Sequence, residues 1–231
     1  MRIYNSAIEA LGEVGRDLTE MGITYQSDTV QDQFVGDDPE FLTKEIMAYS
    51  YMLTSWSDIR DAVEVMGIPI EWVEAEQAER VDLSLINKNP GEAWKLRSDL
   101  WEDFLRNGVF AYSYPERFHA QLPYIYQELK TRPNTRQAII TMYESTKDIM
   151  SWGGRDRVPC SMSYQFLLRE GKLSIIYTQR SCDYKLFFAS DMYFACKLLE
   201  HVAEVIGVNV GHMVHSIGSL HCFKKHLKGI F

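Results

Sequence analysis

The spacing of apolar side chains predicts helices in the first half of the chain. Residues 6–20 place apolar positions at intervals of three and four, which is typical of an amphipathic helix. Residues 39–66 hold two more helical stretches, separated near Thr54 and Ser55. A further helix is expected over residues 118–130. Residues 87–115 contain two clusters of Asn, Gly and Pro without a clear period, so we expect mostly loop with short helices there.

Beyond a predicted turn at residues 132–134, the pattern becomes that of a β-sheet. Strands are predicted at 138–143, 161–169, 172–179 and 208–220, and Glu170-Gly171 marks a hairpin turn between the second and the third. Residues 192–206 are mostly apolar, which indicates a helix buried on more than one side. Helices followed by a sheet that folds around one buried helix predict a single α+β domain over residues 1–231.

Composition narrows the class of protein. The 231 residues carry a net charge of −8 and are 46% hydrophobic, which allows a substantial core and excludes a disordered chain. The acidic balance argues against a broad basic surface for nucleic acid. No apolar run approaches the roughly 20 residues that span a bilayer, and the charged N-terminal segment has no apolar signal sequence. We therefore expect a cytoplasmic protein without a membrane partner, whose four cysteines are reduced thiols.

One cysteine is a candidate nucleophile. Cys160 follows Pro159 at the start of a predicted strand, and Arg180 lies on a nearby predicted strand. An arginine beside the sulfur lowers the thiol pKa and favours the nucleophilic thiolate. Taken alone, Cys160 could equally be a buried core thiol, and Arg180 could belong to a surface ion pair. The cysteines show no zinc-type C-x-x-C pair, so no metal site is expected.

Several short motifs follow one another across residues 158–223. They are Pro159-Cys160, Gln165-Phe166, Gln179-Arg180-Ser181-Cys182-Asp183, Asp191 and Gly218-Ser219-Leu220-His221. In order and spacing they resemble the thymidylate synthase family, most of all its phage branch of deoxycytidylate hydroxymethylases. Weaker similarity reaches back to Glu45, so the resemblance covers most of the chain. It implies a fold with a mixed β-sheet packed on helices and a buried central helix.

The resemblance implies covalent catalysis on a pyrimidine nucleotide. Cys160 would add to C6 of the ring, and C5 would attack the one-carbon unit of the co-substrate, 5,10-methylenetetrahydrofolate. Loss of the C5 proton and of tetrahydrofolate would leave an exocyclic methylene on the ring. Glu45 matches the family glutamate that organises water and moves protons near the base. The alternative for Glu45 is an ordinary solvated glutamate on a helix.

The resemblance also implies a set of binding residues. The implied substrate-binding residues are Arg180, Ser181, Arg136, Gln165, Asp183, Asp191, His221 and Tyr112. Arg180 and Ser181 would hold the phosphate, His221 would contact the sugar hydroxyl, and Tyr112 would lie in the wall of the site. Arg136 matches an arginine donated by the partner subunit, which implies a homodimer with shared sites. The alternatives are structural: a core histidine, core packing for the tyrosine and a surface turn for Arg136.

Asp191 is expected to choose the base. Family members that use uracil have an asparagine here, whereas a carboxyl group can accept from the N4 amino group of cytosine and, with a proton, pair with N3. The alternative is that Asp191 caps a helix that begins at Met192. Ser181 is the residue usual in family members specific for deoxynucleotides, so the resemblance makes dCMP the expected substrate. Phe223 replaces a family tyrosine that binds the sugar hydroxyl, which leaves CMP open.

On the folate side, Asp183 matches the aspartate that contacts the pterin, and Trp101 matches a tryptophan of the folate wall. Several family positions are altered. Ser98, Arg157 and Ser161 replace a tryptophan, an apolar residue and a histidine, and Gln137 replaces the second phosphate-binding arginine. The changes near the cofactor favour attack of water over hydride transfer. The predicted product is therefore 5-hydroxymethyl-dCMP with tetrahydrofolate.

Alternatives to this product remain. The segment 229–231 is a thin candidate for a lid that excludes water, yet a different lid would allow methylation to 5-methyl-dCMP with release of dihydrofolate. A nucleotide-binding relative without turnover is the non-enzyme alternative. A zinc deaminase would need H-x-E and P-C-x-x-C, and residues 159–163 lack the second cysteine. The chain also has no G-x-G-x-x-G or P-loop motif.

Overall fold

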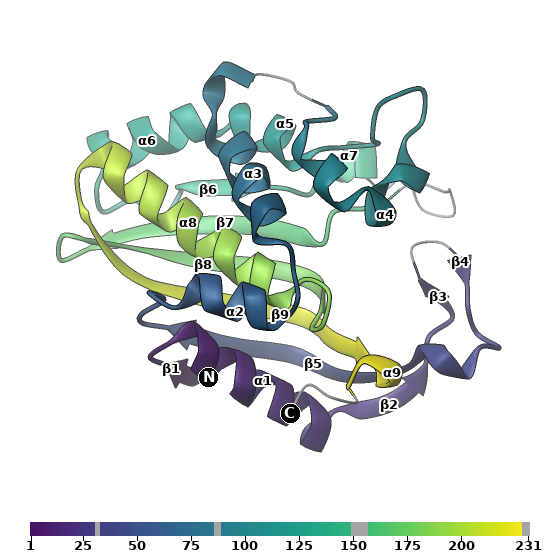
Figure 1. Ribbon diagram of the computed structural model, residues 1–231. Coiled ribbons are helices and arrows are strands. Elements are labelled where there is room, and N and C mark those ends of the chain that lie inside the picture. Colours follow the sequence, from purple (N-terminus) through teal and green to yellow (C-terminus); the bar gives the residue numbers. More distant parts are fainter. Residues whose placement is uncertain (31–32, 86–88, 149–156, 228–231) are drawn as a thin grey trace.

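A computed structural model describes residues 1–30, 33–85, 89–148 and 157–227 (Figure 1). The strands are β1 (Arg2–Tyr4), β2 (Ile23–Gln26), β3 (Thr29–Val30), β4 (Gln33–Phe34), β5 (Leu42–Leu53), β6 (Ile139–Thr141), β7 (Ser161–Arg169), β8 (Lys172–Asp183) and β9 (Asn209–Phe223). The α-helices are α1 (Ala7–Met21), α2 (Ile59–Val65), α3 (Ile70–Val81), α4 (Ser98–Trp101), α5 (Tyr114–His119), α6 (Leu122–Thr131), α7 (Ser145–Asp148), α8 (Phe188–Ile206) and α9 (Lys224–Leu227). Short 3-10 helices lie at Pro39–Phe41, Leu83–Leu85, Ala93–Arg97 and Glu102–Phe104.

Most strands join one mixed sheet. Its order is β1-β5-β9-β8-β7-β6, with β2 also paired to β5. The pairs β1–β5 and β8–β9 are parallel, whereas β5–β9, β7–β8 and β6–β7 are antiparallel. A parallel pair needs a crossover connection, and α8 supplies it between β8 and β9. The predicted α+β fold with a mixed sheet is confirmed.

The crossover helix α8 is the buried central helix. Figure 1 shows it lying across the sheet, and α2, α3 and α6 pack against it. Twelve of its residues are buried, which explains its mostly apolar sequence. It begins at Phe188, four residues before the predicted start, and ends at Ile206. The C-cap Gly207 has a left-handed conformation (φ 76°), which favours glycine.

The prediction of helix over most of residues 39–66 is wrong. Residues 42–53 form β5, and a helix in this range, α2, begins only at Ile59. The second half of β5 alternates buried and partly exposed residues, with Tyr49, Tyr51 and Leu53 facing the core. Hydrogen bonding to β1, β2 and β9 outweighs the local helical spacing. The sheet therefore includes strands from the N-terminal part of the chain, and the sequence is not divided into a helical half followed by a sheet.

Other predicted elements are confirmed. The helix predicted at 6–20 is α1, and its N-cap Ser6 accepts a hydrogen bond from the Glu9 backbone N–H at 3.0 Å. The predicted strands 161–169 and 172–179 are β7 and the first part of β8. Glu170 and Gly171 connect them with positive φ angles of 51° and 73°. In its described part, segment 87–115 is loop with short helices. Among the described residues, no helix combines the length and apolar character needed to cross a bilayer.

Candidate active site

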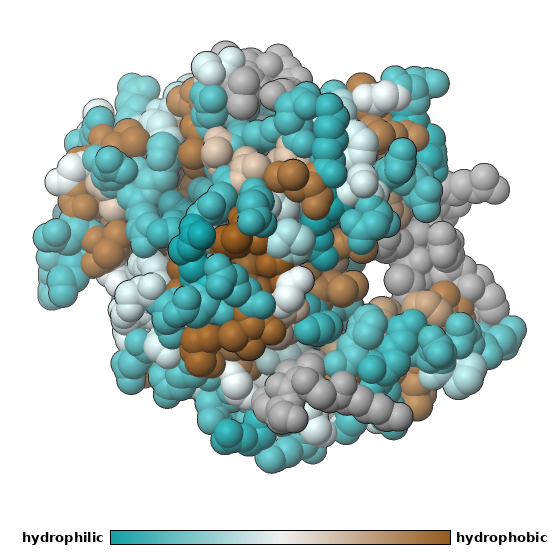
Figure 2. Space-filling view, viewed as in Figure 1, coloured by the Kyte–Doolittle hydropathy of each residue, from teal (hydrophilic) through white to brown (hydrophobic). Residues whose placement is uncertain are grey.

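A cavity of about 680 Å³ gathers most of the predicted site residues. Its walls come from α3, residues 110–115, the ends of β8 and β9 and the first turn of α8. Figure 2 shows apolar side chains near the middle of this face and a hollow to their right, on the side where β3 and β4 project in Figure 1. The helices and the sheet therefore enclose one site from segments far apart in the sequence.

Cys160 lies in the cavity wall immediately before β7 and is half-buried. The Arg180 side chain donates to the carbonyl oxygens of Pro159 and Val158, both at 2.9 Å, so it braces the segment that carries the thiol. Burial raises the pKa of Cys160, while Arg180 and Arg157 oppose that change. The positive charge of Arg180 thus acts to lower the thiol pKa, as predicted. In the protein without a ligand, however, the effect of burial on this pKa is larger.

Asp191 lies in the wall of the same cavity, in the first turn of α8. The N-cap of α8 is Phe187, so the interpretation of Asp191 as the helix cap is wrong. Its Oδ2 accepts a hydrogen bond from Gln179 Nε2 at 2.8 Å and faces the Cys182 thiol at 3.7 Å. Burial raises the pKa of Asp191 to about 6, and the Gln179 hydrogen bond and the positive charge of Arg80 oppose it.

The motif residues of β8 and β9 meet because these strands are parallel neighbours. Asp183 lies opposite His221 in the register, and Ser181 lies opposite Ser219. Gly218 permits this close approach, since a Cβ there would lie 2.8 Å from the carbonyl oxygen of Arg180. The cavity wall includes Arg180, Ser181, Asp183, His221 and Phe223.

Asp183 is the second carboxyl group of this wall. Its Oδ1 accepts hydrogen bonds from the backbone N–H groups of Lys185 at 2.9 Å and Leu186 at 3.0 Å. Burial raises the pKa of Asp183, and His221 opposes the increase. The side chain is therefore fixed by the turn that leads into α8, with His221 across from it.

Glu45 lies outside the described lining of the cavity. It belongs to strand β5, opposite His221, so the alternative interpretation as a glutamate on a helix is wrong. The Ser219 hydroxyl donates to Glu45 Oε1, and Ser219 itself reaches the cavity. Glu45 therefore contacts the site only through a neighbouring side chain.

Sequence reasoning missed the contribution of α3. Glu76 and Arg80 line the cavity and form an ion pair with a distance of 3.0 Å between Arg80 Nε and Glu76 Oε1. Arg80 is buried, and its guanidinium carbon lies 3.7 Å from the centre of the Phe194 ring and 4.6 Å from that of Tyr114. The signal was present, because Trp72, Glu76 and Arg80 recur at every fourth position and share one helix face.

Aromatic side chains form the remaining wall. Trp101 and Tyr112 both line the cavity, as predicted. The Arg157 guanidinium carbon lies 3.8 Å from the centre of the Trp101 ring, and Phe187 packs on the same indole at 6.0 Å. Flat aromatic faces beside a nucleophile suit a planar heterocycle such as a pterin. The residues present therefore fit a folate as well as a nucleotide.

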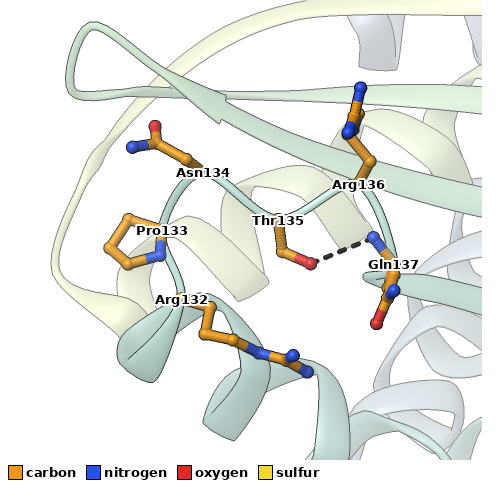
Figure 3. A pocket seen from close by; sticks show the side chains of 6 residues that line it. All are labelled: Arg132, Pro133, Asn134, Thr135, Arg136 and Gln137. Carbon is orange, nitrogen blue, oxygen red and sulfur yellow. Dashed lines mark hydrogen bonds between the residues drawn. The ribbon is translucent and has the colours of Figure 1, made fainter.

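Two predicted binding residues lie elsewhere. Arg136 belongs to the turn 132–137, which lines a separate cavity of about 430 Å³ (Figure 3). Gln165 Nε2 donates to the Arg136 carbonyl oxygen at 3.0 Å, so Gln165 holds this turn in place. In Figure 3, the side chains of Arg132 and Arg136 point away from each other. The predicted turn at 132–134 is confirmed.

The described residues contain no group of three or more side chains suited to a metal ion. The candidate lid at 229–231 lies outside the described residues.

Comparison with known proteins identifies the family of this chain. The thymidylate synthase family model matches residues 51–230. The chain is 34% identical over 116 residues to a Methanocaldococcus jannaschii protein named "Putative thymidylate synthase", and 30% identical over 110 residues to thymidylate synthase of Listeria monocytogenes. These matches cover 50% and 48% of this chain and only 52% and 34% of the relatives. Because the family model covers most of the sequence, the chain belongs to the thymidylate synthase family.

Proposed function

We propose that this protein transfers a one-carbon unit from methylenetetrahydrofolate to C5 of dCMP and releases 5-hydroxymethyl-dCMP. The observation that carries the proposal is a carboxyl group, Asp191, in the same cavity as the candidate nucleophile Cys160. The cysteine supports the covalent chemistry, and the carboxyl group supports a cytosine base. The likeness to phage deoxycytidylate hydroxymethylases is part of this proposal.

Asp191 supports cytosine because of its donor and acceptor pattern. Cytosine presents an N4 amino donor and an N3 acceptor, whereas uracil presents an N3–H donor and an O4 acceptor. A carboxyl group with one proton accepts from N4 and donates to N3. With its pKa raised to about 6, Asp191 takes up that proton near neutral pH more readily than an exposed aspartate.

The other site residues divide the remaining work. Cys160 forms a bond to C6 and leaves again when the product forms. Arg180 and Ser181 bind the phosphate, His221 the sugar, and Asp183 and Trp101 the folate, which supplies the one-carbon unit when bound. Burial raises the pKa of Cys160 and the charge of Arg180 opposes that change, so Arg180 supports the thiolate as well as phosphate binding.

Two glutamates are candidates for moving protons. Glu76 lines the cavity directly, whereas Glu45 reaches it through Ser219. We expect Glu76→Gln to lower turnover more than Glu45→Gln, because proton transfer needs direct contact with the substrate or one bridging water. Steady-state turnover with melting curves on both variants checks this, since Glu76 also neutralises buried Arg80. A larger loss of turnover in Glu45→Gln would instead assign the proton transfer to Glu45.

Arg157 supports water as the final reactant. Its guanidinium lies against Trp101 in the cavity wall, with its carbon 3.8 Å from the centre of the ring. Five N–H donors in such a position attract water or a ligand. Water retained there favours hydroxymethylation, whereas hydride transfer needs a dry site.

The test is to incubate the protein with dCMP and methylenetetrahydrofolate and to identify the nucleotide by mass spectrometry. A hydroxymethyl product without dihydrofolate supports the proposal. A methyl product with equal dihydrofolate identifies a dCMP methyltransferase. Turnover of CMP or dUMP in place of dCMP would contradict the sugar or the base assignment. Binding of a nucleotide without any turnover would favour the non-enzyme alternative.

Methylation of dUMP is the second candidate function. It is favoured by the names of the relatives, which are thymidylate synthases. Against it stands Asp191 in the proposed orientation, because the oxygen that accepts from N4 of cytosine would face another acceptor, O4, in uracil. Parallel reactions with dUMP and dCMP at equal concentration separate the two candidates.

The proposal includes a homodimer. Helices α1, α2, α3 and α8 cover one face of the sheet in Figure 1, and the family is typically dimeric. On the opposite face, β7, β8 and β9 present partly exposed residues such as Leu167, Ile176 and Val214. A sheet face with small polar and apolar side chains suits a second copy, which would bring its Arg136 to the phosphate.

A further inference from the structure

A chain of hydrogen bonds leads from Asp191 into the core. Gln179 Nε2 bonds to Asp191 Oδ2 at 2.8 Å, and Gln179 Oε1 lies 2.7 Å from His215 Nε2. On the other side of the imidazole, Nδ1 lies 3.1 Å from the Tyr51 hydroxyl. Residues from β5, β9, β8 and α8 are thus linked in one line.

The imidazole in the middle of this chain is held firmly. His215 is fully buried and lies opposite both Tyr51 and Tyr177 in the sheet register. Its ring stacks on Tyr177 with centres 4.6 Å apart and on Phe188 with centres 6.1 Å apart. Burial lowers the pKa of His215 to about 3, so the ring is neutral and carries one N–H.

A neutral imidazole allows two directions for the chain. In the first, Tyr51 donates to Nδ1, Nε2–H donates to Gln179 Oε1, and the Gln179 amide donates to Asp191. In the second, every bond is reversed, and Asp191 must donate a proton from Oδ2. Tyr51 decides between them: it is fully buried, and its hydroxyl has no other hydrogen-bond partner among the described residues. The reversed chain would leave the hydroxyl proton buried without an acceptor, which is costly.

We infer that His215 is a positioning residue for base selection: its Nε2–H orients the Gln179 amide so that Asp191 Oδ2 can only accept. Any proton on Asp191 is then carried by Oδ1, the oxygen without a hydrogen bond to Gln179. With Oδ2 towards position 4 of the ring and Oδ1–H towards position 3, the carboxyl group matches the N4 amino group and N3 of cytosine and opposes O4 and N3–H of uracil. This inference rests on the proposed function, because it explains how Asp191 distinguishes dCMP from dUMP.

The tautomer can be measured without any substrate. Long-range ¹H–¹⁵N NMR spectra of the full-length protein at pH 7 distinguish an Nε2–H imidazole from an Nδ1–H imidazole. His215→Gln identifies the signals, since it removes only those of this ring. An Nε2–H signal is expected. An Nδ1–H signal would overturn the inference, whatever the protein's substrate proves to be.

Base preference is measured by calorimetric titration of dCMP and dUMP into the wild-type protein and its variants. We expect His215→Phe to lower the dCMP-to-dUMP affinity ratio about tenfold, as for one misdirected hydrogen bond. His215→Gln can still donate to Gln179, so it should lower the affinity ratio less than His215→Phe does. It also replaces His215→Phe in the test if that variant does not fold. Tyr51→Phe shifts the ratio in the same direction as His215→Phe.

Tyr184→Phe is the matched control. It also removes a buried phenol hydroxyl, one that donates to the Leu11 carbonyl oxygen at 2.7 Å, and it is expected to leave the ratio unchanged. An unchanged ratio in folded His215→Phe or His215→Gln would overturn the inference while the wild type still prefers dCMP. A wild type that prefers dUMP would instead contradict the proposed function.

Discussion

At the scale of single residues, Cys160 differs from the other thiols in its position. It is half-buried in the cavity wall, whereas the other three cysteines are buried, among them Cys182 in the same wall and Cys196 within α8. We expect Cys160→Ala to lower turnover about a thousandfold or more while nucleotide binding persists, because the other thiol of the cavity wall, Cys182, is buried. Cys196→Ala is the matched control and should retain most activity. Turnover assays with calorimetric binding check both, and an active Cys160→Ala would exclude covalent catalysis by this residue.

Asp191 should also leave a signature in the pH dependence of stability. Its pKa is about 6 in the folded protein against an ordinary 3.8, so the folded state binds more protons between these values. The contribution of Asp191 to the free energy of unfolding therefore falls by up to about 3 kcal/mol as pH rises from about 4 to about 6, and it is constant above.

Asp191→Asn cannot ionise and avoids that loss. Its advantage over the wild type in free energy of unfolding should be small at pH 4 and should grow towards pH 7. Urea unfolding at several pH values measures the difference, in which the other carboxyl groups cancel. A difference that does not change with pH would show that Asp191 titrates normally.

At the scale of elements, the β7–β8 hairpin offers a test of turn chemistry. Glu170 adopts a positive φ of 51°, an unfavourable conformation for a residue with a long side chain, and Gly171 follows at 73°. Asn-Gly is the preferred pair for such a turn, so Glu170→Asn should stabilise the protein by about 0.5–1 kcal/mol. Thermal unfolding measures this. Glu170→Gln removes the same charge without the turn preference and should give no comparable gain.

The same hairpin shows which elements the sequence predicts well. Its strands are neighbours in the chain and its turn residues lie between them, so local pattern is sufficient. Strand β5 is different, because the residues that it pairs with in β1 and β9 are about 50 and about 170 positions away in the sequence. Residues 42–53 are extended because they pair with distant strands, and the local spacing of apolar residues does not indicate this. The error on β5 also misplaced Glu45 on a helix.

The residues of the candidate site likewise divide into those that local motifs predict and those that only the fold brings together. Cys160, Arg180, Asp191 and His221 were predictable because short motifs carry them, and they do line one cavity. Glu76 and Arg80 were missed because the position of α3 at the cavity depends on its packing against α5, α8 and the 3-10 helix Ala93–Arg97. His215 has no motif, and its importance comes from what it contacts in the fold.

At the scale of the whole molecule, the two faces of the sheet differ in what covers them. The inner face is buried under helices, while the outer face presents small polar and apolar side chains, among them Ser174, Ile176 and Thr178 on β8. We propose that a second copy of the chain covers the outer face and that each copy contributes its Arg136 to the active site of the other. Arg136 is absent from the described lining of the cavity that holds Cys160, so a contribution to that site would have to come from the partner.

Mixing two inactive variants tests this sharing of sites. Cys160→Ala lacks the nucleophile, and Arg136→Ala lacks the donated cation, so each homodimer should be nearly inactive at low dCMP. In a mixed dimer, the site of the Arg136→Ala subunit has Cys160 and receives Arg136 from its partner. Equal mixing after subunit exchange should restore about a quarter of wild-type activity, because about half of the dimers are mixed and each has one complete site of two. If Arg136 acted within its own subunit, no mixed dimer would contain a complete site and activity would not return.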